Sequence, residues 1–285
     1  MEHHHEGLAA DLERLLETAT SRRQSLRWLL SGMAALPLAG CGGGGSIGSV
    51  DVSAAASSVG STGSTGSTGA SCAIIPEETG GPYPGDGTNS NGSGIANALT
   101  LAGIVRSDIR TSVAPGSATA QGIPLTIKLQ LVNVSASCAS VAGAAVYLWH
   151  CDRDGNYSMY ASGLTKENYL RGVQEADTNG VVSFTTIFPG CYAGRMPHVH
   201  FEVFPTLAKA ASAAGRIKTS QFTFPMATLN EVYADSSYAA SWRNLASISY
   251  ATDNVFSDGT ALQMGAVSGN ASTGYTVSLV VGVSL

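Results

Sequence analysis

The chain has 285 residues, of which 44% are hydrophobic and 12% are charged, and its formal net charge is -5. This composition is typical of a globular protein with a substantial core, and the length suits one large domain. The acidic balance leaves no basic surface of the kind that nucleic acid requires, so no nucleic-acid partner is expected.

The first residues, 1–41, are predicted to be an export signal. An arginine pair, Arg22 and Arg23, resembles the twin-arginine pattern and precedes an apolar run at 29–38 that is too short to span a bilayer. The sequence Leu-Ala-Gly before Cys41 is similar to a bacterial lipobox. We therefore expect an exported lipoprotein that is anchored to a membrane through a lipid on Cys41 and faces away from the cytoplasm.

The next stretch, 42–71, is rich in Gly, Ser and Thr and contains repeated Ser-Thr-Gly triplets. It has too few apolar groups to form a core, which predicts a flexible tether and a folded domain at 72–285. Four cysteines fall in that domain, and an even number in an oxidising compartment permits three disulfide connectivities between them. They are Cys72, Cys138, Cys151 and Cys191.

The domain has the periodicity of an all-β protein. Leucines and isoleucines alternate with polar residues at 125–131, which predicts a strand with one buried face. Many short strands between turn signals favour a sandwich or a barrel with long loops, and one short helix is expected at 226–233. Weaker strand patterns lie at 98–105, 144–150, 181–187, 198–204, 216–224 and 274–285.

The segment around His198 and His200 contains the most informative chemistry. Side chains two apart on a strand share a face, so the two imidazoles can point at one place. Imidazole is a common metal ligand, and the pattern predicts a metal site. Glu202 shares that face on a straight strand, and two histidines with a carboxylate would also suit Fe(II) in an oxygenase or Zn(II) in a hydrolase.

Two upstream segments bring tyrosines and an arginine toward this strand. One follows the sequence Trp-His-Cys-Asp through a glycine-containing turn to Tyr157, and the other, Phe-Pro-Gly-Cys, leads to Tyr192 and Arg195. Loops at strand ends are where a rigid β scaffold usually carries its site. These residues are therefore candidates for the same site as the histidines.

With the sequence Pro-Glu-Glu-Thr-Gly-Gly-Pro-Tyr at 76–83, these segments resemble the intradiol ring-cleavage dioxygenases. The resemblance extends from about residue 74 to residue 224 and is looser toward the C-terminus. Its motifs follow in the family's order, and the chain is similar to the exported, single-chain branch. The resemblance implies a β-sandwich. Its central motifs are Trp-x-Cys-Asp-x-x-Gly-x-Tyr-Ser, Leu-Arg-Gly, Asp-x-x-Gly, Thr-Ile-x-Pro-Gly-x-Tyr and Arg-x-x-His-x-His.

The resemblance also implies roles for individual residues. A non-haem Fe(III) would be held by two tyrosinates and two imidazoles, while Arg195 would stabilise charge on the substrate ring and Gln221 would support the site. Tyr169 competes with Tyr157 for the first tyrosine position, and the family spacing favours Tyr157. The four implied ligands are Tyr157, Tyr192, His198 and His200.

The expected reaction is cleavage of a catechol-type ring between its two hydroxyls with O2, giving a muconate-type diacid. The implied partners are thus a small aromatic diol and O2, and no oligomeric state is predicted. Two alternatives stay open. One is an Fe(II) or Zn(II) enzyme that uses His198, His200 and Glu202, and the other is a non-catalytic β-sandwich at the cell surface that binds a partner.

Overall fold

The computed structural model describes residues 72–285. The expected signal at 1–41, its lipid site Cys41 and the tether at 42–71 lie outside the described residues. The domain boundary near Cys72 therefore stays a prediction. Within the described part of the chain, no helix has the length and apolar character needed to cross a membrane.

The alternating segment predicted as a strand forms the centre of the first sheet. Strand β3 (Pro124–Asn133) pairs in parallel with β11 along one edge and antiparallel with β7 along the other. β10 pairs with β11, and the short β4 pairs with the last two residues of β3. The remaining members of this five-stranded sheet are β4 (Ala139–Ser140), β7 (Val181–Ile187), β10 (Ala266–Asn270) and β11 (Gly274–Val283).

The second sheet has four antiparallel strands in the order β6-β5-β8-β9. Its two central strands, β5 and β8, are buried at every residue, because both faces of this sheet are covered. The edge strands pair on one side only. The bounds of the four strands are β5 (Ala145–Trp149), β6 (Arg171–Glu175), β8 (His198–Phe204) and β9 (Lys218–Thr223).

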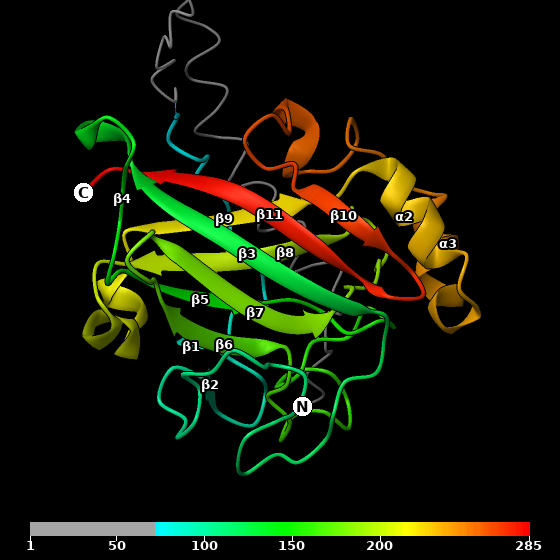
Figure 1. The fold of residues 1–285 in the computed structure, drawn as a ribbon. Coiled ribbons are helices and arrows are strands. Elements are labelled where there is room, and N and C mark those ends of the chain that lie inside the picture. Colours follow the sequence, from blue (N-terminus) through cyan, green and yellow to red (C-terminus); the bar gives the residue numbers. More distant parts are fainter. Residues whose placement is uncertain (1–71) are drawn as a thin grey trace, which may run out of the picture. The chain divides into compact units, whose positions relative to one another are not determined.

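The two sheets form a sandwich around one hydrophobic core (Figure 1). Apolar side chains of β3 such as Ile127 and Leu129 pack in the same buried cluster as Val199 and Phe201 of β8. The opposite face of β5, with Tyr147 and Trp149, belongs to a second cluster. The four-stranded sheet thus separates the main core from a second covered face.

Short elements complete the described chain. A two-stranded hairpin precedes β3, and two helices lie beside the end of the sandwich that carries β10 (Figure 1). Five 3-10 turns connect other elements. The bounds are β1 (Asp86–Ser90), β2 (Ile95–Asn97), α2 (Met226–Tyr233), α3 (Ala239–Leu245), η1 (Val134–Ala136), η2 (Leu207–Ala211), η3 (Ala213–Gly215), η4 (Ser236–Tyr238) and η5 (Phe256–Asp258).

The all-β fold class is confirmed, and the strands expected from 125 onward all form within a few residues of their predicted bounds. The strand expected at 98–105 is wrong. Ala98, Leu99 and Ile104 are buried within a series of turns, whereas Val105 is 54% exposed, and Gly103 has a φ of +85°, which a strand does not allow. The expectation of a single helix is also wrong, because α3 forms in addition to α2.

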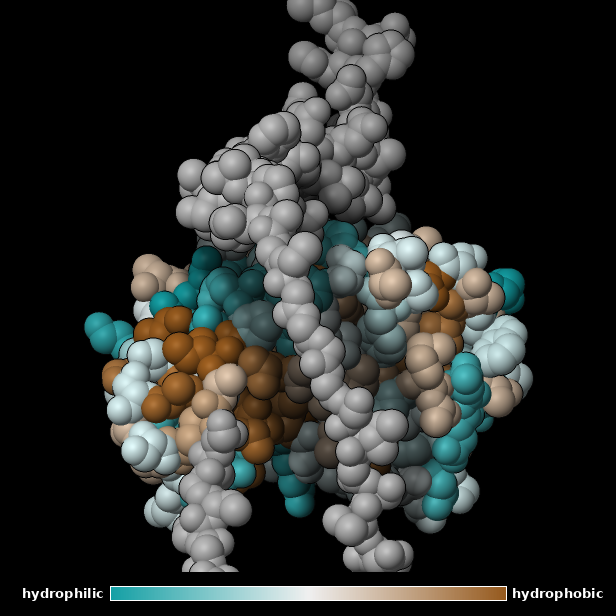
Figure 2. Space-filling model, turned by 90° about the horizontal axis from the view of Figure 1, so that it is seen from above, coloured by the Kyte–Doolittle hydropathy of each residue, from teal (hydrophilic) through white to brown (hydrophobic). Residues whose placement is uncertain are grey.

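The outer face of the five-stranded sheet is open to solvent. Lys128 and Gln130 of β3 point away from the core, and Val280 of β11 is 54% exposed. Figure 2, which views the molecule from above, shows a group of hydrophobic residues beside hydrophilic ones. Isolated apolar residues of this kind are normal on a protein surface.

One disulfide forms among the described cysteines. Cys72 and Cys138 are bonded, with their Cα atoms 5.9 Å apart, while Cys151 and Cys191 are free and buried. Only one of the two bonds that each predicted connectivity requires is present. The other two cysteines stay reduced. The bond ties the first described residue to the turn after β3.

We expect Cys72→Ser and Cys138→Ser each to lower the free energy of unfolding by about 2–5 kcal/mol, because the bond closes a 66-residue separation in the unfolded chain. Urea unfolding under oxidising conditions measures this loss. The double variant should lose no more than either single variant, and a reductant should lower the stability of the wild type alone. Additive losses would show that the two cysteines act separately.

Candidate functional site

Strand β8 presents two buried histidines on the face that points away from the main core. His198 and His200 are 2% and 3% exposed, while Val199 between them lies in the core. His198 Nδ1 lies 2.6 Å from the carbonyl of Met196, which can only accept a hydrogen bond. Nδ1 therefore carries the proton, and Nε2 presents a lone pair to the site, as in most metal-binding histidines.

The ring of His200 is oriented by its neighbour across the sheet. Trp149 of β5 pairs with His200 in register, and the two rings stack with centroids 4.9 Å apart and an interplanar angle of 2°. His200 Nε2 lies 3.1 Å from His198 Nε2. The Met196 carbonyl orients the His198 ring, and the Trp149 ring orients the His200 ring. Their two Nε2 atoms therefore face one point.

Two tyrosine oxygens meet the histidines at this point. Tyr157 Oη lies 3.3 Å from His198 Nε2, and Tyr192 Oη lies 3.2 Å from the same atom. Tyr157 is 3% exposed, whereas Tyr192 is only partly buried. The four side chains that the sequence singled out as ligands are thus brought together, although they come from three separate segments.

Close contact between two loops places the tyrosines. The turn before Tyr157 contains Gly155, whose φ is +87° and where a Cβ would lie 3.0 Å from Cβ of Tyr192. At Gly190 a Cβ would lie 2.6 Å from the carbonyl oxygen of Asp152. Only glycine allows both approaches without displacement of the neighbouring chain. These two glycines explain why the tyrosines converge.

Tyr169, the competitor for the first tyrosine position, lies elsewhere. Its hydroxyl donates to Asp152 Oδ2 at 3.3 Å, and its carbonyl accepts from the Ser158 hydroxyl at 2.7 Å. Its side chain belongs to a separate buried cluster with Leu170. The geometry therefore associates Tyr157, and not Tyr169, with the histidine pair.

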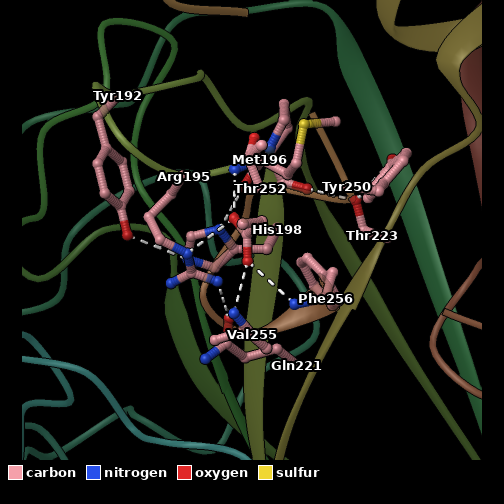
Figure 3. A network of polar contacts seen from close by, with 12 residues as sticks. Tyr192, Arg195, Met196, His198, Gln221, Thr223, Tyr250, Thr252, Val255 and Phe256 are labelled. Carbon is pink, nitrogen blue, oxygen red and sulfur yellow. Dashed lines mark hydrogen bonds and ion pairs between the residues drawn. The ribbon is translucent and has the colours of Figure 1, made fainter. Parts of the chain in front are cut away.

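Arg195 and Gln221 form a polar network beside His198 (Figure 3). Arg195 Nη2 donates to Gln221 Oε1 at 2.7 Å, and Gln221 Nε2 donates to the carbonyl of Thr79 at 2.8 Å. Arg195 Nε donates to Asp253 Oδ2 at 3.0 Å. The arginine side chain is 12% exposed, so a nearly buried cation lies next to the two histidines and two tyrosines.

Burial governs the protonation of the site. It lowers the pKa of His198 and of His200 well below the usual value, and the positive charge of Arg195 lowers both further. Burial raises the pKa of Tyr157, and raises that of Tyr192 to about 12, while Arg195 opposes both increases. The imidazoles are therefore neutral near pH 7, as metal ligands must be.

Glu202 does not join the histidines. Its Oε1 lies 3.6 Å from Arg216 Nη1, and burial followed by the charge of Asp86 raises the pKa of Glu202 to about 8. Within residues 72–285 no three or more His, Cys, Asp or Glu side chains are arranged to hold a metal. The alternative with two histidines and a carboxylate has no geometric support, since Glu202 contacts the hairpin side of the strand.

Several supporting residues escaped prediction from the sequence. Asp253 contacts Arg195 from a loop 58 positions downstream, and nothing in its Thr-Asp-Asn context distinguishes it from a turn residue. Ser241 accepts from the backbone N–H of Cys191 at 2.9 Å, and Asn244 donates to the Cys191 carbonyl at 2.7 Å. Helix α3 thereby holds the peptide that precedes Tyr192.

The donor atoms fit one iron ion. Two ligand atoms each about 2.1 Å from one metal lie about 3.0–3.4 Å apart at angles between about 90° and 109°. The three distances measured to His198 Nε2 are 3.1, 3.2 and 3.3 Å. Imidazole nitrogen and tyrosine oxygen are both iron ligands in proteins. In both spacing and chemistry, the set is suited to non-haem iron.

Comparison with known proteins agrees with this geometry. Residues 104–211 match the family model described as Dioxygenase, a range that contains all four metal-type donors and Arg195. An intradiol ring-cleavage dioxygenase from Tetranychus urticae has a similar structure, with a TM-score of 0.56 and 24% identity over 75% of this chain and 95% of that chain.

Two more distant structures have lower scores. The dioxygenase domain of a dioxygenase carbohydrate-binding protein fusion from Streptomyces sp. SirexAA-E has a TM-score of 0.45 and 21% identity, over 75% of this chain and 99% of that chain. Catechol 1,2-dioxygenase from Pseudomonas arvilla C-1 has a TM-score of 0.39 and 19% identity, over 64% and 58%. The family match and the β-sandwich thus make the chain similar to the intradiol ring-cleavage dioxygenases in fold.

Proposed function

We propose that the protein is an Fe(III)-dependent intradiol dioxygenase that opens a catechol-type ring between its hydroxyls with O2. The observation that supports this most directly is the convergence of two tyrosine oxygens and a second imidazole within 3.1–3.3 Å of His198 Nε2. Tyr157, Tyr192, His198 and His200 would hold the iron. Bound Fe(III) would supply a Lewis-acid and redox centre at which a deprotonated diol becomes reactive toward O2.

Under this proposal the two tyrosines have different tasks. Tyr157 is the more deeply buried and would stay in place, whereas Tyr192 is partly exposed and would be the tyrosine that meets an entering hydroxyl group. Burial raises the pKa of Tyr192 to about 12, so its phenolate oxygen would take a proton from the diol and keep it. Tyr192 Oη is thus the proposed acceptor of one substrate proton.

Arg195 would stabilise negative charge on the ring. Its guanidinium is nearly buried, and electrostatic stabilisation is strongest where water is excluded. Gln221 holds Nη2 and is itself held by the Thr79 carbonyl, so the cation does not have to reorganise during the reaction. The same positive charge favours neutral imidazoles and charged phenolates, which are the ligand forms that iron requires.

We also propose that the protein is exported and attached to a membrane by a lipid on Cys41. The Cys72–Cys138 disulfide supports this, because such bonds persist in oxidising compartments and are rare in the cytosol. The proposal places ring cleavage outside the cytoplasm, where the chain would meet aromatic diols before their uptake.

The iron-loaded protein should be red-brown, because tyrosinate-to-Fe(III) charge transfer absorbs visible light. Tyr157→Phe should weaken this band, whereas Tyr169→Phe should leave it unchanged, since the Tyr169 hydroxyl binds Asp152 and not the histidines. Visible spectroscopy at one equivalent of bound iron measures both. A colourless iron complex contradicts the proposal, and loss of the band in Tyr169→Phe alone would reverse the choice of ligand.

Reaction with catechol under ¹⁸O2 should give a muconate-type diacid that contains both labelled atoms, as detected by mass spectrometry. Arg195→Gln should lower kcat by about 10²–10³-fold, the usual cost of one lost electrostatic contact to developing charge. Opening beside the hydroxyls would indicate Fe(II) chemistry instead. Absence of turnover by an iron-loaded wild type would favour a binding module.

Expression of the full chain in a bacterial host with labelled palmitate should label the protein, and Cys41→Ala should abolish the label. The matched control is Cys151→Ala, which removes a buried cysteine within the domain and should leave labelling intact. Labelling of the Cys41→Ala variant would contradict the anchor.

A further inference from the structure

We propose that Asp253 is a positioning residue that fixes the Arg195 guanidinium for the reaction at the iron site. The inference rests on the proposed function and adds to it a residue outside the matched range 104–211. Its support is a set of contacts in which one buried carboxylate binds the arginine and the segment that carries His198.

The Asp253 carboxylate is fully buried and receives four hydrogen bonds. Oδ2 accepts from Arg195 Nε at 3.0 Å and from the backbone N–H of Met196 at 2.7 Å. Oδ1 accepts from the backbone N–H groups of Val255 and Phe256 at 2.8 and 3.1 Å. All four partners are donors, so the contacts match an ionised carboxylate, which only accepts.

Each carboxylate oxygen has a different task. Oδ1 caps the turn that begins η5 and belongs to the local fold of its own loop. Oδ2 binds the residue proposed to act on the substrate and, through Met196, the residue whose carbonyl holds His198 Nδ1. A carboxylate needed only for the turn would not have to reach Arg195.

The guanidinium is held on three sides. Asp253 binds Nε, Gln221 binds Nη2, and the Phe256 ring centroid lies 6.0 Å from Cζ. Nη1 takes part in neither hydrogen bond, so it remains available for charge on the substrate. Asp253 is the only one of these three groups with a negative charge, and it balances a cation that is 12% exposed.

Loss of this contact should affect reaction more than binding. A displacement of about 1 Å in a reacting arrangement can cost about 10²-fold in rate. Asp253→Asn keeps an oxygen for the turn but turns an amide donor toward Nε and the N–H of Met196. We expect kcat to fall by about 10–100-fold, with less than about a threefold change in KM.

A double-mutant cycle with Arg195→Gln separates positioning from structure. If Asp253 acts through Arg195, Asp253→Asn should have less than about a threefold further effect on kcat in the Arg195→Gln background. Full additivity of the two losses would overturn the proposal. Asp177→Asn is the matched control, because Asp177 Oδ1 also caps two backbone N–H groups, at 2.8 and 2.9 Å, in a turn away from the site.

A second measurement does not depend on iron or turnover. In ¹⁵N NMR spectra of the metal-free protein, the Arg195 Nε–H signal should be protected from solvent exchange, and Asp253→Asn should remove that protection while Asp177→Asn preserves it. Retained protection in Asp253→Asn would overturn the inference. An inactive wild type with this NMR result would refute the proposed function and leave the Asp253–Arg195 contact established.

If Asp253→Asn does not fold, Arg195→Lys tests the same point. Lysine keeps the charge but cannot reproduce the planar pair of donors that Nε and Nη2 provide. We expect kcat of Arg195→Lys to fall nearly as far as that of Arg195→Gln. A loss of less than about threefold would show that the orientation of the guanidinium is unimportant, and the role of Asp253 would be wrong.

Discussion

The two faces of strand β8 are both buried, and the site depends on this constraint. Val199, Phe201 and Val203 enter the main core, which fixes the strand in position and register. His198 and His200 must then face the other way, because successive side chains of a strand alternate. A shift by one residue would place two imidazoles in the hydrophobic core, so core formation also orients the metal-type ligands.

Burial of this second face determines the chemistry of the site. Removing the imidazoles from water keeps them neutral, and the nearby arginine adds to this effect while it favours charged phenolates. One buried cation thus lowers the pKa of both histidines and opposes the rise in the pKa of both tyrosines. The cost of burying Arg195 is offset by Asp253, which is itself fully buried and hydrogen-bonded.

The C-terminal third of the domain supports the site from outside. Helix α3 holds the peptide before Tyr192 through Ser241 and Asn244, and the loop after it supplies Asp253. These segments lie beyond the matched family range, yet they hold the peptide before Tyr192 and the guanidinium of Arg195. The four candidate ligands and the residues that hold their loops therefore come from different parts of the chain.

The sequence alone determined the β architecture, the histidine strand and the tyrosine and arginine segments, because alternation and short motifs are local signals. It did not determine the turns at 98–105, helix α3 or the position of Asp253. These depend on contacts between segments far apart in the chain, such as the 58 positions between Arg195 and Asp253. The family spacing already favoured Tyr157 over Tyr169, but only the tertiary structure brings Tyr157 to the histidines, because two glycines let the loops approach.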